Sequence, residues 1–156
     1  RIPFWSGNAK MRVGGESAVS VSPGGYYTVK RIWDKSVLLE LTLDFSLQFL
    51  KGEKDFEGLG SIYYGPLLLC LDPIYNQSVD YLHPPILDAT DIRVEKVSED
   101  KRAGVLVRVS SKSKSLVLCD LYTAGVSGTP YTSWLPLRGV EKNNFSKYNP
   151  RRTTIR

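Results

Sequence analysis

The sequence contains few of the residues that carry catalysis. Among 156 residues there are one histidine and two cysteines. His83 precedes Pro84 and Pro85 and has no serine or cysteine signature to pair with, so we interpret it as a loop residue. Cys70 and Cys119 are too far apart in the sequence to form the closely spaced ligand cluster of a structural zinc site. We therefore predict no catalytic residue and no metal site in this chain.

Both cysteines lie within apolar, strand-like runs, at residues 68–71 and 117–119. Free cysteine is among the most buried residue types, so we predict two buried free thiols. A disulfide between them requires Cα atoms within about 7 Å of each other. The sequence leaves that distance, and with it the compartment of the protein, open.

Other functional signatures are also missing. No apolar run approaches the roughly 20 residues that span a membrane, so we predict no membrane partner. The pairs Gly14-Gly15 and Gly24-Gly25 lack the Lys-Ser or Lys-Thr that follows in a phosphate-binding loop, and we interpret them as turns. The sixteen acidic residues include no pair that the sequence singles out for glycoside hydrolysis.

The net charge of +5 is concentrated at one end of the chain. Residues 1–73 carry eight basic and eight acidic side chains, and residues 74–139 carry eight and seven. Residues 140–156 carry five basic side chains against Glu141 alone, and we interpret them as a basic C-terminal tail. A body so close to neutral lacks the basic patch that nucleic acids require, so we predict no nucleic-acid partner.

The apolar residues recur with the period of a β-strand. Between residues 39 and 49 they alternate with polar residues without a break, which predicts one long, half-buried strand. Residues 10–13 and 19–22 alternate in the same way around Gly14-Gly15, as in a β-hairpin. Residues 27–33 predict a further strand. No segment shows the recurrence of an amphipathic helix.

The second half of the chain shows further strands. The apolar run at residues 67–71 predicts a central strand that is covered on both faces. Three more strands are predicted around residues 92–94, 105–109 and 116–120. We predict an all-β fold, an antiparallel β-sandwich made of two small β-units. The expected divisions are a first unit at 1–73, a proline-containing linker at 74–88, a second unit at 89–139 and the tail at 140–156.

Aromatic side chains are the remaining candidates for a binding role. Trp5 and Trp33 fall within strand patterns, so we expect them to pack in a sheet interface. Tyr131 and Trp134 follow a glycine-, serine- and threonine-rich stretch at residues 123–130. Because tyrosine and tryptophan faces can stack on sugars, these two are our candidate sugar-contact residues.

Three segments of the first half resemble the β-L-arabinofuranosidases of glycoside hydrolase family 127. They are RIPFW at residues 1–5, PGGYYTVKRIW at 23–33 and SIYYGPLLL at 61–69, in matching order and spacing. Residues 116–137 resemble the family's last strands through GTPY and SWLP, whereas residues 74–115 show no resemblance. Gly14-Gly15 stands where the family more often has Asn-Gly, a change that keeps the turn.

In that family an upstream helical (α/α)₆ barrel carries the active site, with a cysteine nucleophile beside a zinc ion bound by cysteines and a glutamate. This chain has neither an adjacent cysteine pair nor such a helical segment, so the resemblance assigns it no catalytic residue. Because it begins with Arg1 rather than Met, we expect it to be part of a longer protein, and the resemblance implies that it is the C-terminal β-sandwich region of a hydrolase. The zinc is then expected in the catalytic domain of that hydrolase, and the sugar and linkage stay open.

The resemblance implies a non-catalytic accessory region whose partner is the upstream helical catalytic domain, which it braces. Two alternatives stay open: a carbohydrate-binding module with a glycan as its partner, and a protein-interaction sandwich unrelated to hydrolysis. A brace separated from its barrel should expose apolar surface. We expect that surface within residues 1–73, with Phe4 or Trp5 contributing, and we expect the isolated chain to self-associate.

Overall fold

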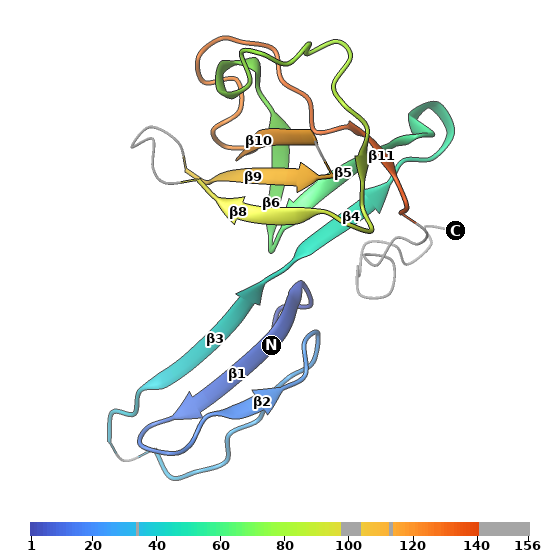
Figure 1. Cartoon of the computed structure of the whole chain (residues 1–156). Coiled ribbons are helices and arrows are strands. Elements are labelled where there is room, and N and C mark those ends of the chain that lie inside the picture. The colour runs from blue at the N-terminus through green and yellow to red at the C-terminus, as the bar shows by residue number, and fades with distance from the viewer. Residues whose placement is uncertain (34, 98–103, 113, 141–156) are drawn as a thin grey trace, which may run out of the picture. The chain divides into compact units, whose positions relative to one another are not determined.

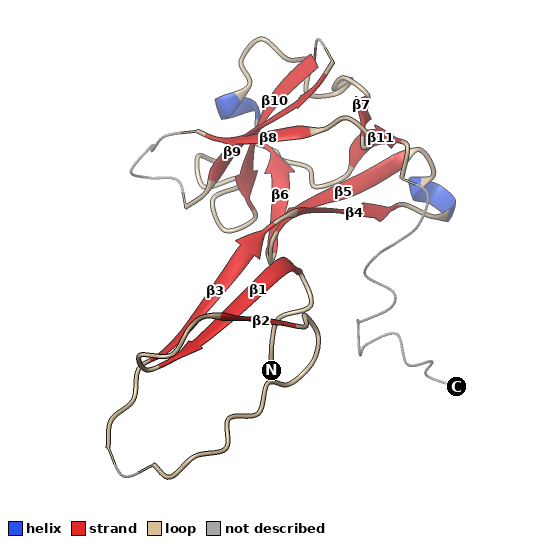
Figure 2. Ribbon diagram, turned by 60° about the horizontal axis from the view of Figure 1, so that its bottom comes forward, coloured by secondary structure: helices blue, strands red, loops and turns tan. Residues whose placement is uncertain are grey.

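The computed structural model describes residues 1–33, 35–97, 104–112 and 114–140. These residues form eleven strands and two short 3₁₀ helices, which confirms the all-β class (Figures 1 and 2). The chain divides into two compact units between Ser46 and Leu47. Apart from Val140, the predicted basic tail lies outside the described residues.

The first unit is a three-stranded antiparallel sheet in the order β2-β1-β3. The strands are β1 (Ser6–Val13), β2 (Val19–Val21) and β3 (Leu39–Phe45). The predicted hairpin between β1 and β2 is confirmed. Its turn contains Gly14 at a φ of 58°, a conformation that glycine adopts without a steric penalty.

The cross-strand register separates an apolar from a polar face of this sheet. Met11 lies opposite Val19 on one side and Leu41 on the other, so these three side chains share a face. The neighbouring positions present Lys10 and Thr42 on the opposite face. Arg12 and Glu40 form an ion pair there at 2.5 Å, which raises the pKa of the Arg12 guanidinium chiefly through the hydrogen bond to Glu40.

The apolar alternation of residues 39–49 forms two strands instead of one. β3 ends at Phe45 and β4 (Leu47–Lys51) begins after Ser46. The two strands pair with different partners, β3 with β1 and β4 with β5 (Leu59–Tyr64). The pattern predicts the local strand conformation, but the change of partner at Ser46 depends on residues far away in the sequence.

Residues 27–33 do not form the predicted strand, and the prediction for Trp33 is wrong. No strand lies between β2 and β3 among the described residues. The Trp33 side chain is 54% exposed, with the guanidinium carbon of Arg31 5.4 Å from its ring centroid. Without a paired strand there is no sheet interface in which this ring could pack. Trp5 is half-buried and meets Phe45 edge to face, with ring centroids 5.1 Å apart.

The second unit holds the larger sheet, in the order β7-β11-β5-β6-β10-β9-β8, with β4 paired to β5. The sheet is mixed, because β7 runs parallel to β11 while the other pairs are antiparallel. Its remaining strands are β6 (Leu67–Leu71), β7 (Leu87–Asp88), β8 (Arg93–Lys96), β9 (Leu106–Ser111), β10 (Lys114–Asp120) and β11 (Leu135–Arg138). The 3₁₀ helices are η1 (Lys54–Phe56) and η2 (Pro73–Tyr75).

β6 is central, as predicted, and covered on both faces. Leu69 and Leu71 point into the main core, which residues of β5, β7, β9, β10 and β11 also enter. Cys70 points to the other side and packs with Leu106 and Cys119. A strand that is buried on both faces needs apolar residues at every position, which explains the uninterrupted run.

The structure divides the chain at a different place from the sequence. Residues 47–73, expected in the first unit, belong to the second because β5 and β6 pair with β11 and β10. The expected linker, residues 74–88, is also part of the second unit and contributes β7. Leu87 of β7 is fully buried in the main core, so this segment is not a free connection.

Candidate functional site

The apolar face of the first sheet is only partly covered within its unit. At one end Ile2 packs on Ala9 and Val21, and all three are buried. Towards the other end Val19, Leu39 and Leu41 are 43%, 49% and 39% exposed. We call these three residues, together with Met11 between Val19 and Leu41, the open apolar face.

Further large apolar side chains are exposed in the same unit. They lie mainly in the segment between β2 and β3, and they are Tyr26, Tyr27, Ile32, Trp33, Leu38 and Phe45. Scattered apolar side chains are normal on protein surfaces, but a contiguous group of them marks an interaction site. The cross-strand register makes the open apolar face such a group.

The candidate sugar-contact residues lie in or beside a long loop, residues 121–134, that two buried aspartates hold in place. Asp72 follows β6 and accepts hydrogen bonds from the Gly125 amide at 3.0 Å and the Thr129 hydroxyl at 2.7 Å. It also caps η2 through the Ile74 amide at 3.0 Å. Burial alone would raise the pKa of Asp72, but the hydrogen bonds outweigh it and lower the pKa below its usual value.

Asp120 holds the beginning of the same loop. Its carboxylate accepts hydrogen bonds from the backbone amides of Val105, Tyr122 and Thr123. The Thr123 hydroxyl donates to Asp120 at 3.1 Å and accepts from the Gly104 amide at 2.8 Å. These bonds join the loop to the start of β9, so the loop follows a fixed path.

Tyr131 and Trp134 pack against different neighbours. The Tyr131 ring lies on Gly125, where an added Cβ would come within 2.8 Å of it, and its side chain is 45% exposed. Gly125 has a φ of 74°, so two constraints favour glycine there. Trp134 stacks on Phe56 of η1, with ring centroids 4.6 Å apart. Their sugar-contact role stays a prediction.

The residues that could support catalysis or metal binding are dispersed. His83 is exposed and lies 2.9 Å from Asp80, and this hydrogen bond lowers the pKa of the Asp80 carboxyl. The described residues contain no group of three or more histidine, cysteine, aspartate or glutamate side chains that could hold a metal ion. Within the same residues, no helix is long and apolar enough to cross a membrane.

The two cysteines are buried and free, as predicted. Burial raises the pKa of Cys70 to about 11 and that of Cys119 to about 12, and nearby charges add to both shifts. A thiol with so high a pKa is almost entirely protonated near neutral pH and is a poor nucleophile. Neither cysteine has the environment of a catalytic thiolate.

Sequence reasoning missed the aspartates that shape the loop. Asp72 directly precedes Pro73, and an aspartate before proline at the start of a helical turn is a capping signal that could have been used. No local pattern marks its bonds to Gly125 and Thr129, which lie more than fifty residues away. Asp120 comes at the end of an apolar run, and nothing else in the local sequence indicates that it holds the loop.

Comparison with known proteins shows which family the first unit resembles. Residues 1–45 match the family model described as "Beta-L-arabinofuranosidase, GH127 middle domain". The first unit matches family 127. This confirms the resemblance predicted from the sequence, and the model that matches describes the family's middle domain. A comparison with curated proteins finds no significant match.

Solved structures share the fold over most of the chain. A glycoside hydrolase has a TM-score of 0.67 and 23% identity, over 88% of this chain and 27% of its own. A family 127 β-L-arabinofuranosidase from Geobacillus stearothermophilus T6 has a TM-score of 0.67 and 16% identity, over 88% and 26%. A further family 127 β-arabinofuranosidase has a TM-score of 0.63 and 17% identity, over 83% and 23%. At these identities the likeness concerns the fold, and the chain spans about a quarter of each structure's length.

Proposed function

We propose that this chain is a non-catalytic accessory region of a glycoside hydrolase similar to the β-L-arabinofuranosidases of family 127. In this proposal the open apolar face docks on the helical catalytic domain of the same hydrolase and braces it. The observation that carries the proposal is the partial exposure of Val19, Leu39 and Leu41 on one sheet face. A sheet whose apolar face is half covered gains stability when another element buries the rest.

The match to a middle domain supports this role. A middle domain has other domains on both sides, and this chain spans only about a quarter of the length of the structures that share its fold. The family's cysteine nucleophile and zinc ligands have no counterparts among the described residues. We therefore assign hydrolysis, and the zinc expected from the resemblance, to the catalytic domain.

Two substitutions on adjacent positions of β3 test the docking face. Leu41 lies on the open apolar face, and Thr42 lies on the polar face opposite Lys10. When the catalytic domain and this chain are expressed together as two separately tagged polypeptides, Leu41→Glu should abolish their co-purification because it places a charge in an apolar interface. The matched control Thr42→Glu adds the same charge to the other face and should leave co-purification unchanged. Equal behaviour of the two variants would refute the docking proposal.

The two alternative functions predict different binding partners. A carbohydrate-binding module would bind a glycan saturably through Tyr131 and Trp134, and a calorimetric titration of the chain with Tyr131→Ala as the comparison tests this. A protein-interaction sandwich unrelated to hydrolysis would use the open apolar face for another partner. The two rings have different packing neighbours, Tyr131 lying on Gly125 and Trp134 on Phe56, so each is tested by its own substitution.

A further inference from the structure

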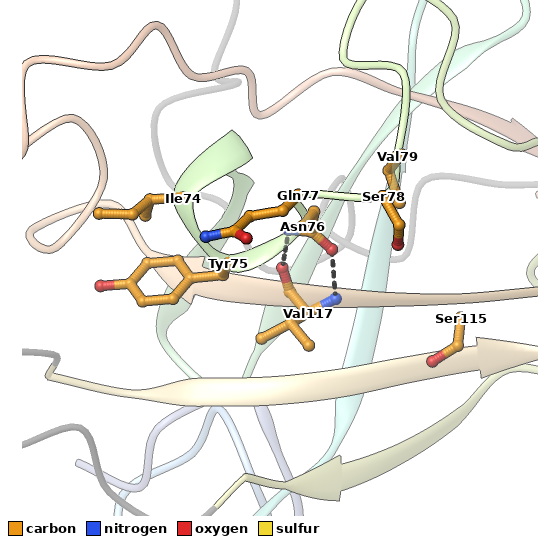
Figure 3. A pocket seen from close by; sticks show the side chains of 8 residues that line it. All are labelled: Ile74, Tyr75, Asn76, Gln77, Ser78, Val79, Ser115 and Val117. Atoms are coloured by element: carbon orange, nitrogen blue, oxygen red, sulfur yellow. Dashed lines mark hydrogen bonds between the residues drawn. The ribbon is translucent and has the colours of Figure 1, made fainter.

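A pocket of about 420 Å³ lies in the second unit, and neither candidate aromatic residue lines it. It is formed by η2 and the turn that follows, residues 74–79, together with Ser115 and Val117 of β10. Figure 3 shows Tyr75 and Ser115 on either side of Val117, with Asn76 above it. The volume lies within the range of small-ligand sites, about 300–1,000 Å³.

Asn76 makes the pocket rigid. Its side-chain amide is buried, accepts a hydrogen bond from the Val117 backbone at 2.9 Å and donates to the Val117 carbonyl at 2.7 Å (Figure 3). It also donates to the Asp72 carbonyl at 3.0 Å. The Asn76 side chain thus pairs with both backbone groups of Val117, as a neighbouring strand would, and fixes the turn to β10. A preformed pocket binds a ligand without the cost of ordering a loop.

The exposed side chains of the pocket are neutral and polar. Gln77 and Ser78 are exposed and have no hydrogen-bond partner among the described residues. The Ser115 hydroxyl accepts a hydrogen bond from Ser110 at 3.2 Å, which leaves its own hydrogen available to donate. Amide and hydroxyl groups both donate and accept, as sugar hydroxyls do.

The remaining surface of the pocket is apolar. Val117 and Tyr75 are half-buried and pack on the Cys70 cluster, and Ile74 is exposed at the side. None of the lining residues carries a charge, so the pocket has no group to pair with a phosphate or a carboxylate. Apolar carbon beside neutral donors and acceptors matches the C–H face and the hydroxyl edge of a saccharide.

We propose that this pocket is a subsite for a neutral saccharide, with Gln77, Ser78 and Ser115 as its hydrogen-bonding residues. The proposal is independent of the docking role of the first unit. It places a sugar contact on the turn after β6 instead of on Tyr131 and Trp134. Because the pocket is open and offers few hydrogen bonds, we expect an affinity on the order of 1 mM.

The test is a titration of the isotope-labelled chain, followed by NMR chemical shifts. The probes are L-arabinose, D-xylose, D-galactose and methyl β-L-arabinofuranoside, each raised to about 50 mM, well above the expected dissociation constant. At least one probe should shift the amide signals of Gln77, Ser78 and Ser115 saturably. In the double variant Gln77→Ala, Ser115→Ala the dissociation constant should rise about tenfold, because two exposed hydrogen-bonding groups are lost.

Tyr131→Ala serves as the control outside the pocket and should leave the affinity unchanged. Both side chains changed in the double variant are exposed, and circular dichroism should show that the variant stays folded. Absence of any saturable shift, or shifts that centre on Tyr131 and disappear in Tyr131→Ala, would overturn the proposal. An unchanged affinity in the double variant would overturn it as well.

Discussion

Cys70 and Cys119 lie directly opposite each other on the paired strands β6 and β10. Both side chains are fully buried, and the Cys119 thiol donates to the Cys70 carbonyl at 3.6 Å. The two cysteines pack with Leu106 and Tyr75 in a smaller core, which lies on the face of β6 opposite the main core. The cysteines therefore act as small apolar core residues.

We predict that both thiols react slowly in the native chain. Burial keeps them protonated and blocks access, since the pKa values are about 11 and about 12. At pH 8 a thiol reagent should label both cysteines rapidly in denaturant and label neither on the same timescale under native conditions. Rapid labelling of either residue without denaturant contradicts this packing.

The same pKa values predict a loss of stability in alkali. A thiol whose pKa is higher in the folded than in the unfolded state stabilises the protein fully below the unfolded value, near 9.0. As pH rises above that value, the thiols of the unfolded chain lose their protons before those of the folded chain. The free energy of unfolding therefore falls until the pH exceeds the pKa of the thiols in the folded chain. Urea unfolding at pH 7, 9 and 10 should show a decreasing free energy of unfolding. The variant Cys119→Ala should show a smaller decrease, and an equal decrease would assign the effect to other groups.

The loop at residues 121–134 should depend on Asp72. In Asp72→Asn one of the two carboxylate oxygens becomes an NH2 group, which cannot accept a hydrogen bond, so the Gly125 amide or the Thr129 hydroxyl loses its acceptor. We expect the free energy of unfolding to fall by about 2 kcal/mol, because a buried donor is left without its partner. Hydrogen exchange of the Gly125 amide should accelerate. The exposed Asp80→Asn is the matched control and should change the stability little.

Acid should weaken the same contact. The lowered pKa of Asp72 means that its stabilising effect is present above the usual value of 3.8 and is lost as pH falls through the folded pKa. The difference in stability between the native chain and Asp72→Asn should therefore be largest near neutral pH and shrink below about pH 4. A difference that stays constant with pH would show that the charge of Asp72 plays no part.

The local periods of the sequence predicted most strands, because alternation of apolar and polar residues follows directly from side chains pointing to opposite faces. The hairpin at Gly14 and the central strand β6 were predictable in this way. The division at Ser46 was not, because β3 and β4 have the same alternation and differ only in the strands they pair with. Strand partners are decided by contacts between distant parts of the chain.

The candidate surfaces were predictable to different degrees. The alternation around Leu41 predicted a half-buried strand, but only the register with Met11 and Val19 showed how much of that face remains uncovered. Trp33 lies in a similar pattern and is exposed, because no strand pairs with its segment. The pocket at Gln77 depends on Asn76 reaching a backbone forty-one residues away, which no local motif encodes.

The open apolar face also predicts how the isolated chain behaves. With Val19, Leu39 and Leu41 in water, two copies can bury apolar area by apposing these faces, so we expect association that increases with concentration. Sedimentation velocity at several concentrations should show it. Leu41→Glu should shift the equilibrium towards the monomer, because the charge would have to lose its water in the interface. Thr42→Glu changes the net charge equally on the polar face and should associate like the unmodified chain. If the unmodified chain and both variants are all monomeric, the open apolar face does not drive self-association. That result would count against the brace.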